Sequence, residues 1–430
     1  MGSTLSSPAT WKTTESGENS RYAYGATEMQ GWRITMEDEH VAELQLEDSE
    51  QPNAFFAVFD GHSGKGSSEF ARAHLHRRLV QEDTYKQQQY EQALKHAFLS
   101  TDKDMGTPGF DPKYVHDDSG CAAVSALITN DKIYVANAGD SRSVLSVAGV
   151  AKALSTDHKP TLESERKRIV AAGGYVKDHR VNGHLALSRG LGDFRHKANT
   201  ELAPEDQIMT ADPEIKVHDI TDEDEFLVLA CDGIWDCLSS QQVVNVVRRA
   251  VATGSALDKI CEDLCDLCLA PDTRGGESIG CDNMSVVIVA MLNGKTQDEW
   301  YAMVRERVEQ GHGYATPVEP PQLYSPERVR HIRAYIEEKM MKDEQRRRER
   351  EKEAEAKADE ASTDGATPDT QDDVKGKAAE LSNGDQQQQP TEERKAGSSG
   401  EGKEEPIDTV DYNADTDQYK TSHASTQDGR

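Results

Sequence analysis

The sequence has no long apolar segment, few basic residues for its acids and an odd number of cysteines. No run approaches the roughly 20 apolar residues that span a bilayer, and residues 1–12 lack the apolar centre of a secretory signal. Because seven cysteines cannot all pair and no export signal is seen, we expect reduced thiols in the cytoplasm or the nucleus. Lys and Arg number 49 against 78 Asp and Glu, a net charge of −29 that disfavours nucleic acid as a partner.

Large apolar residues are scarcest towards the C-terminus. The hydrophobic fraction is 35% over 430 residues, and residues 351–430 are the poorest part, so we expect a disordered acidic tail there. We expect a flexible N-terminal arm over residues 1–21, a structured domain over 22–293 and a helical extension over 294–350. A helix is predicted over 326–352 of that extension, and Arg346–Arg348 is either part of this charged, solvated helix or a nuclear localisation signal.

Within residues 22–293, short apolar runs alternate with turn signals and with groups of helices. This pattern favours an α+β domain with mainly antiparallel sheets over a doubly wound fold. The predicted strands are Ala54–Phe59, Cys121–Ile128, Ile133–Asn137, Val144–Val147, Phe226–Cys231 and Val286–Leu292. The predicted helices are Ser67–Val80, Tyr90–Leu99, Leu162–Ala172, Ser240–Ala252 and Ala256–Leu269. The last helix carries a stripe that indicates a buried face rather than a metal site, formed by Cys261, Cys265 and Cys268.

Aspartates stand at the ends of several predicted strands. Asp60 and Asp232 directly follow apolar runs, Asp140 follows a third run after two residues, and Asp282 comes just before the last run. If the last strand pairs antiparallel with the others, all four carboxylates gather at one rim of the domain. A single Asp-Gly pair is more often an ordinary turn, but four such placements favour a shared site.

Carboxylates crowded at one rim repel each other, and a divalent cation removes that repulsion. Because these donors are all oxygen atoms, Mg²⁺ or Mn²⁺ suits them better than zinc. Paired ions of this kind activate water for attack on phosphoesters. Arg33 is the right type of residue to bind a phosphate, and His62 to protonate a leaving alkoxide.

Further motifs follow one another in order across residues 22–293. They are Gly31-Trp32-Arg33, Met36-Glu37-Asp38, Phe59-Asp60-Gly61-His62-Ser63-Gly64, Asn137-Ala138-Gly139-Asp140-Ser141-Arg142, Asp157-His158-Lys159-Pro160, Arg180-Val181-Asn182-Gly183, Leu187-Ser188-Arg189-Gly190-Leu191-Gly192-Asp193, Asp232-Gly233-Ile234-Trp235-Asp236 and Asp282-Asn283-Met284-Ser285. In order and spacing this set resembles the metal-dependent serine/threonine protein phosphatase 2C family, and most of all its fungal members. So many motifs in order are far more specific than any one of them.

The resemblance implies a β-sandwich of two mainly antiparallel sheets flanked by helices, with residues 22–293 as the phosphatase catalytic domain. It also implies two Mn²⁺ or Mg²⁺ ions per active site and a weaker third ion. Asp60 would bridge the two ions, with Asp232 and Asp282 on one of them. The other implied ligands are the carbonyl of Gly61 and the Glu37 carboxylate at the second ion, and Asp140 and Asp236 at the third.

The resemblance also implies roles for three catalytic residues. Arg33 would bind the phosphate, and His62 would be the general acid, oriented by Asp38. A water or hydroxide bridging the metals would attack phosphoserine or phosphothreonine directly. Asp193 is interpreted as structural, and the segment Val176–Leu187 resembles the family's flap beside the active site, where substrate choice is set.

The partners implied by the resemblance are phosphorylated proteins, kinases among them, which suggests a monomeric negative regulator of kinase signalling. Met1–Ser6 fits the pattern for myristoylation at Gly2, which gives at most weak, reversible membrane contact, and a polar arm fits equally well. Two alternatives are a non-catalytic scaffold with a phosphatase-like domain and a two-metal nuclease. The complete set of Arg33 and acids opposes the first, and the net charge of −29 without a basic patch in the structured part opposes the second.

Overall fold

The computed structural model describes residues 4–111, 113, 118–273, 279–327, 329–330, 341, 410–413 and 418–421. The chain divides into two units, Met1–Ile336 and Glu337–Arg430. In the second unit the described residues include an antiparallel pair of short strands, β15 (Val410–Asn413) and β16 (Gln418–Thr421). The remainder of the predicted acidic tail lies outside the described residues, as do Gly2 and Arg346–Arg348.

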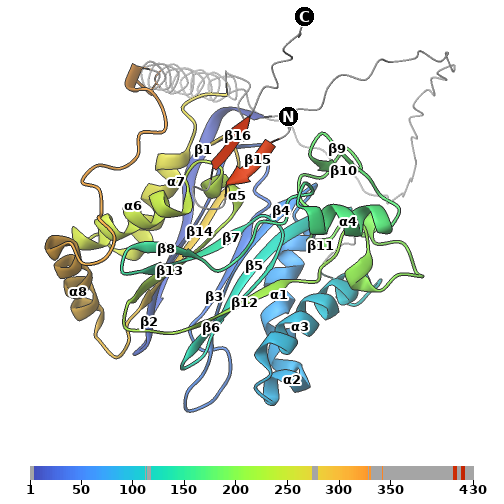
Figure 1. The fold of residues 1–430 in the computed structure, drawn as a ribbon, viewed down its shortest axis with the longest axis horizontal. Helices are drawn as coiled ribbons and strands as arrows, with labels where there is room; N and C mark the ends of the chain where they lie inside the picture. Colours follow the sequence, from blue (N-terminus) through green and yellow to red (C-terminus); the bar gives the residue numbers. More distant parts are fainter. Residues whose placement is uncertain are drawn as a thin grey trace, which may run out of the picture. The chain divides into compact units, whose positions relative to one another are not determined.

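The first unit is a sandwich of two antiparallel sheets (Figure 1). One sheet has the strand order β1 (Thr4–Glu18), β2 (Tyr22–Arg33), β14 (Met284–Met291), β13 (Asp224–Ala230), β7 (Arg142–Val147) and β8 (Val150–Ala153). The other has the order β12 (Glu214–Asp219), β6 (Lys132–Ala138), β5 (Gly120–Ile128), β4 (Ala54–His62) and β3 (Glu39–Glu43), with β11 (Leu191–Gly192) beside β5. Apolar side chains of both sheets meet in one buried core between them, including Ala26, Phe56, Val124, Leu227 and Val287.

Helices cover the outer faces of both sheets (Figure 1). Helices α1 (Gly66–Gln81), α2 (Asp83–Lys86) and α3 (Tyr90–Met105) pack on the β4 side. Helices α5 (Asp232–Trp235), α6 (Ser240–Ala252), α7 (Leu257–Cys268) and α8 (Gln297–Gln310) pack on the β14 side. The loops between strands hold α4 (Glu163–Ala171), the hairpin of β9 (Val176–Lys177) and β10 (Arg180–Val181), and two 3₁₀ turns, Phe194–His196 and Pro204–Asp206.

Most of the predicted elements are confirmed. The six predicted strands are β4, β5, β6, β7, β13 and β14, and the five predicted helices are α1, α3, α4, α6 and α7, with ends that differ by a few residues. The α+β class with antiparallel sheets is confirmed as well. The cysteines of α7 are free thiols on a buried helix face, as predicted. No helix in the described ranges is long and apolar enough to cross a membrane.

The prediction of a flexible arm over residues 1–21 is wrong for Thr4–Glu18, which forms strand β1 along β2. Its residues are mostly polar and show no apolar alternation, so their pattern does not predict a strand. Backbone pairing to β2 places these polar side chains against partners on helix α7. Lys12 forms an ion pair with Asp266 (2.7 Å), and Thr14 donates to Glu262 (3.0 Å). Pairing across the sheet therefore orders a segment that is too polar to form a core by itself.

The helical extension predicted over residues 294–350 begins with helix α8, but from its end to Ser325 the described chain has no helix. Buried Arg248 anchors this stretch by donating to the carbonyl oxygens of Tyr314 (2.7 Å) and His312 (3.0 Å). Farther along, the Tyr324 hydroxyl donates to the carbonyl of Cys268 (2.6 Å). Most of the helix predicted over 326–352 lies outside the described residues.

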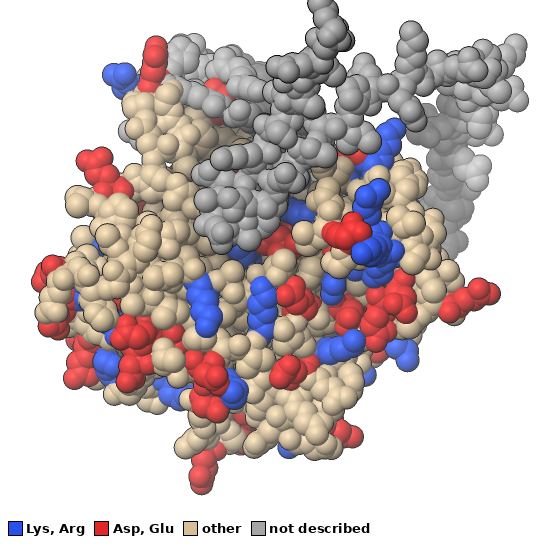
Figure 2. Space-filling view, in the orientation of Figure 1, with Lys and Arg blue, Asp and Glu red and all other residues tan. Residues whose placement is uncertain are grey.

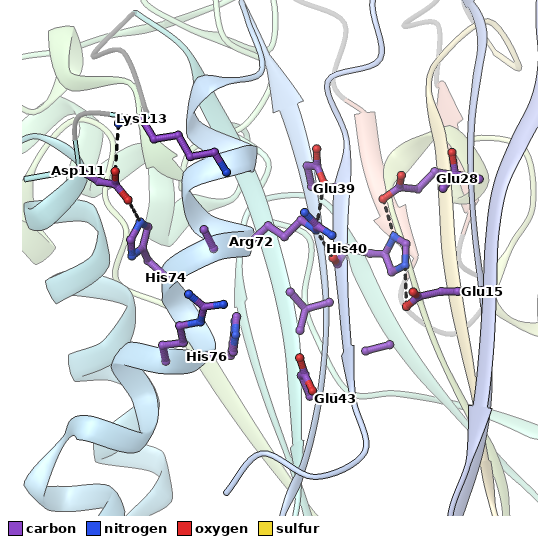
Figure 3. A pocket seen from close by; sticks show the side chains of 15 residues that line it. Glu15, Glu28, Glu39, His40, Glu43, Arg72, His74, His76, Asp111 and Lys113 are labelled. Carbon is purple, nitrogen blue, oxygen red and sulfur yellow. Dashed lines mark hydrogen bonds and ion pairs between the residues drawn. The ribbon is translucent and has the colours of Figure 1, made fainter.

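A groove of about 620 Å³ lies where strand β3 faces β1, β2 and helix α1 (Figure 3). In it, the imidazole of His40 is bonded through Nδ1 to Glu28 of β2 and through Nε2 to Glu15 of β1 (3.2 Å). Burial by itself would lower the pKa of His40, but the hydrogen bonds and charges of the two glutamates raise it to about 9. The protonated ring thus joins the edges of the two sheets.

This raised pKa predicts a pH-dependent contribution to stability. Because the folded pKa of about 9 exceeds the ordinary histidine pKa of 6.5, the stabilisation is complete below pH 6.5 and is lost as the pH rises through 9. We expect His40→Gln to lower the free energy of unfolding by about 2 kcal/mol at pH 6.5 and by much less at pH 9.5. Urea unfolding at both values tests this, with His179→Gln on the exposed hairpin as control. An equal loss at both pH values would contradict the prediction.

Candidate metal centre

Three strand ends deliver the predicted aspartates to one edge of the sandwich. Asp60 lies near the C-terminal end of strand β4, where it pairs with Ala122 of β5. Asp232 begins α5 directly after β13, and Asp282 stands two residues before β14. Because β13 and β14 are antiparallel neighbours, with Ala230 opposite Val286, the end of one lies beside the start of the other. The antiparallel arrangement predicted for this last strand is confirmed.

Two glycines allow the loops of this edge to lie against each other. A Cβ atom on Gly61 would stand 2.1 Å from the carbonyl oxygen of Glu37. A Cβ atom on Gly233 would stand 2.0 Å from the carbonyl oxygen of Asn283. No other residue fits so close to neighbouring backbone, so the glycine of each Asp-Gly pair is needed for the loops to meet.

The carboxylates of Asp60, Asp232 and Asp282 at this edge are half-buried and repel one another. Burial, followed by the charges of Asp232, Asp38 and Asp282, raises the pKa of Asp60 well above its usual range. Burial and the neighbouring charges of Asp140 and Asp282 do the same to Asp232. Asp236 is more exposed to solvent, yet partial desolvation and the charges of Asp140 and Asp282 raise its pKa as well. The crowding expected from the strand ends is therefore present, and ionised carboxylates need positive charge among them.

Two basic side chains provide part of that charge. Arg33, at the end of β2, forms an ion pair with Asp282. The charges of Asp282, Asp232 and Asp60 outweigh the effect of burial and raise the pKa of its guanidinium. Lys159 donates to Asp140 (2.6 Å) and is also close enough to Asp232 and Asp236 for their charges to raise its pKa. With these contacts in place, no group of three or more His, Cys, Asp or Glu side chains in the described residues is already arranged to hold an ion.

The loop before β3 is held against this edge by Asn283. Its side-chain nitrogen donates to the carbonyls of Gln30 (2.9 Å) and Thr35 (3.0 Å), while its side-chain oxygen accepts from the backbone N–H of Glu37 (3.0 Å). The carboxylate of Glu37 in turn accepts from the backbone N–H of Gly64 (3.2 Å). Asn283 thus places Glu37 beside the loop that contains Gly61.

The carboxylate that contacts His62 is Asp193, at 3.0 Å from Nε2. The expectation that Asp38 orients His62 is therefore wrong: Asp38 accepts from the hydroxyl of Ser285 (2.8 Å) on β14 instead. Burial raises the pKa of Asp38 to about 7. Burial would lower the pKa of His62, but the hydrogen bond and charge of Asp193 raise it above its ordinary value.

Three residues at this site were missed by reasoning from the sequence. Asp193 was interpreted as structural, although its left-handed φ of 53° in a glycine-rich stretch marks a turn that aims its side chain at His62. Lys159 and Asn283 lie in the motifs Asp157–Pro160 and Asp282–Ser285, but no role at the site was predicted for either. A lysine next to a proline and an asparagine after an aspartate are common in loops, and no local pattern distinguishes them.

The donor chemistry of this edge fits hard divalent cations. The carboxylates and the carbonyl of Gly61 are oxygen donors, and the raised pKa values of Asp60 and Asp232 show how much positive charge would stabilise their ionised forms. The two cysteines adjacent in sequence, Cys231 and Cys281, are buried in apolar clusters. Mg²⁺ or Mn²⁺ therefore fits the residues present better than zinc does.

Comparison with known proteins gives concordant matches. The family model described as protein phosphatase 2C matches residues 22–275, more than half of the chain. Protein phosphatase 2C homolog 2 of Hypocrea jecorina is 51% identical over 333 residues, which cover 76% of this chain and 75% of that protein. Protein phosphatase 2C homolog 3 of Schizosaccharomyces pombe is 48% identical over 328 residues, which cover 76% and 78%.

The fold matches solved structures as well. The crystal structure of serine-threonine phosphatase 2C from Toxoplasma gondii superimposes with a TM-score of 0.55 at 20% identity, covering 65% of this chain and 99% of that one. At this identity the likeness concerns the fold alone. The family match and the two fungal relatives, however, go further than the fold, and they show that this chain belongs to the protein phosphatase 2C family.

Proposed function

We propose that this protein phosphatase hydrolyses phosphoserine and phosphothreonine in proteins, and that it requires two Mn²⁺ or Mg²⁺ ions to do so. The observation that carries the proposal is the group of half-buried, mutually repelling carboxylates at one edge of the sandwich, with Arg33 and His62 beside it. Such a group is unfavourable without cations. Its position next to one arginine and one histidine suits a phosphate monoester.

Asp60 would bridge the two ions, Asp232 and Asp282 would bind one of them, and Glu37 and the carbonyl of Gly61 the other. Asp140 and Asp236 would bind a weaker third ion, in a place where Lys159 already supplies a positive charge to Asp140. When bound, the divalent ions lower the pKa of water and neutralise developing negative charge on the phosphate.

The side chains around the carboxylates supply binding and proton transfer. The Arg33 side chain is 46% exposed, so its guanidinium can exchange Asp282 for phosphate oxygens, to which it donates two parallel hydrogen bonds. Asp193 occupies Nε2 of His62, which leaves Nδ1 as the atom that passes a proton to the departing serine or threonine oxygen. The raised pKa of His62 favours the protonated form that this role needs.

We further propose that kinases are among the substrates, that the protein limits kinase signalling, and that it acts as a monomer in the cytoplasm and nucleus. Myristoylation at Gly2 would add weak membrane contact. The proposals on substrates and oligomeric state rest on the family resemblance, that on location on the cysteines and Arg346–Arg348, and that on Gly2 on the pattern of Met1–Ser6.

Hydrolysis of a phosphothreonine peptide with and without metal tests the proposed activity. We expect phosphate release with Mn²⁺ or Mg²⁺, its loss in excess chelator, and its recovery when the metal is restored. A non-catalytic scaffold would release no phosphate under any condition. A nuclease would cleave an oligonucleotide and leave the peptide intact. Release that persists in chelator would contradict the proposed requirement for metal.

A further inference from the structure

One part of this acidic protein is basic. Residues 163–197 carry eight Lys and Arg against four Asp and Glu, whereas the whole chain has a net charge of −29. Figure 2 shows Lys and Arg side chains gathered over the region of helix α4 and the β9–β10 hairpin. The expectation that the structured part has no basic patch is therefore wrong, because the bases of residues 163–197 gather in one region of the fold.

Packing fixes this region next to the metal centre. Ile169 of α4 and Val181 of β10 are buried in one small apolar cluster with Ala122 of β5. Ala122 is the residue that pairs with Asp60 across β4 and β5. The helix and the hairpin thus rest on the strand that lies directly beside the predicted bridging ligand.

A second set of contacts connects the hairpin to His62. The side chain of Asn182, just after β10, meets the ring nitrogen Nδ1 of His196 at 3.3 Å. His196 ends the 3₁₀ turn that begins after Asp193, and its backbone N–H donates to the Asp193 carbonyl (2.9 Å). Asp193 itself contacts His62. A substrate at the metal centre would therefore have its flanking residues near this hairpin.

Several of the bases already have carboxylate partners. Arg168 and Arg189 both bind the buried Glu165 (2.6 Å each), and Lys197 binds Asp102 (2.7 Å). At the surface, Lys167 pairs with Glu163 and Arg195 with Asp118. Among the described residues this leaves three exposed bases without a carboxylate in ion-pair range, Arg166 of α4 and Lys177 and Arg180 of the hairpin.

The hairpin places two of these bases against each other. Lys177 and Arg180 are directly opposite in the β9–β10 pairing. Between them Asp178 and His179 have φ of 51° and 59°, the left-handed pair typical of a tight two-residue turn. Like charges directly opposite on a hairpin destabilise it, and Asp178, the one acid in the turn, is also exposed. An anion bound beside Lys177 and Arg180 would relieve this repulsion.

We propose that Arg166, Lys177 and Arg180 form a basic flap surface that binds aspartate and glutamate side chains flanking the phosphorylated residue of the substrate. The inference rests on the proposed phosphatase function and adds its substrate class, phosphosites in acidic sequences. Charge complementarity supports it, since the net negative charge of the chain repels an acidic peptide while these three bases attract one. Three exposed bases are too few to hold the backbone of a nucleic acid against a net charge of −29.

The test compares three phosphothreonine peptides that differ only in flanking residues, which are acidic, neutral or basic on both sides. We expect kcat/KM to be about tenfold higher for the acidic than for the neutral peptide at low salt, mainly through KM. The preference should shrink as salt is raised, because the three bases are exposed. The double variant Lys177→Glu, Arg180→Glu should lose or invert the preference, through a larger fall in kcat/KM for the acidic than for the neutral peptide.

Lys86→Glu is the control, because Lys86 is an exposed lysine outside the flap, on helix α2, where it pairs with Asp83 (2.9 Å), and it should keep the wild-type preference. Equal kcat/KM for the acidic and neutral peptides, or a preference that survives the double variant, would overturn the inference and leave the phosphatase proposal intact. Failure to hydrolyse any of the peptides would instead count against the proposed function. Fluorescence anisotropy with the same labelled peptides then decides the inference, since only tighter binding of the acidic peptide supports it.

Discussion

Asp60→Asn is expected to reduce turnover of a phosphothreonine peptide on the order of 10³-fold, the loss typical when a charge stabilising group is removed from a site of this kind. The amide has one donor oxygen where the carboxylate has two, and it carries no charge, so it cannot bridge two cations. Stability should behave in the opposite way. Because burial and nearby charges raise the pKa of Asp60, its ionised form costs folding free energy at neutral pH, and asparagine removes that cost.

Two measurements separate these effects. In chelator, the thermal midpoint of Asp60→Asn should equal or exceed that of the wild type, and added Mn²⁺ should raise the wild-type midpoint more. Asp48→Asn, at an exposed position in the loop between β3 and β4, is the control and should change neither turnover nor the response to Mn²⁺. Unchanged turnover in Asp60→Asn would contradict the bridging role.

Asp193→Asn is expected to lower kcat on the order of 10²-fold, within the usual contribution of a positioned general acid. The carboxylate raises the pKa of His62, so its replacement by an amide should lower that pKa and shift the alkaline limb of the kcat–pH profile towards acid. Asparagine is nearly isosteric and tolerates the left-handed φ of 53° at this position, so folding should be little affected.

The variant Asp38→Asn distinguishes the two carboxylates that have been considered as partners of His62. Asp38 contacts Ser285 rather than His62, so Asp38→Asn should leave the alkaline limb in place even if it lowers kcat through its neighbours. If the alkaline limb of the kcat–pH profile shifts in Asp38→Asn but not in Asp193→Asn, Asp38 orients His62, as the family resemblance implies. That result would contradict the contact between Asp193 and His62.

Local patterns predicted the elements that are rich in apolar residues and failed for those that are not. Strand β4 is a run of apolar residues that reads as a strand by itself. Strand β1 is mostly exposed and has no such pattern, and it is ordered by pairing with β2 and by contacts to α7 and to His40. The free energy that stabilises strand β1 comes from partners far away in the sequence, and a short stretch of sequence around β1 does not contain them.

The basic flap surface has a similar origin. Arg168, Arg189 and Lys197 are as basic in sequence as Lys177 and Arg180, but the fold gives the first three buried or half-buried carboxylates. Which charges remain available to a partner therefore depends on the packing around them, because an ion pair formed within the protein cancels a charge that a count along the chain includes.

By itself, the sequence determined the sandwich's main strands and helices, the oxygen-rich character of the site and the strand ends that carry Asp60, Asp232 and Asp282, because these follow from residue type and short-range periodicity. Only the tertiary structure decided that Asp193 rather than Asp38 contacts His62, since that contact joins loops 131 residues apart. Which acid meets which base at that range is set by loop conformation and by competing partners, and both come into being only when the chain has folded.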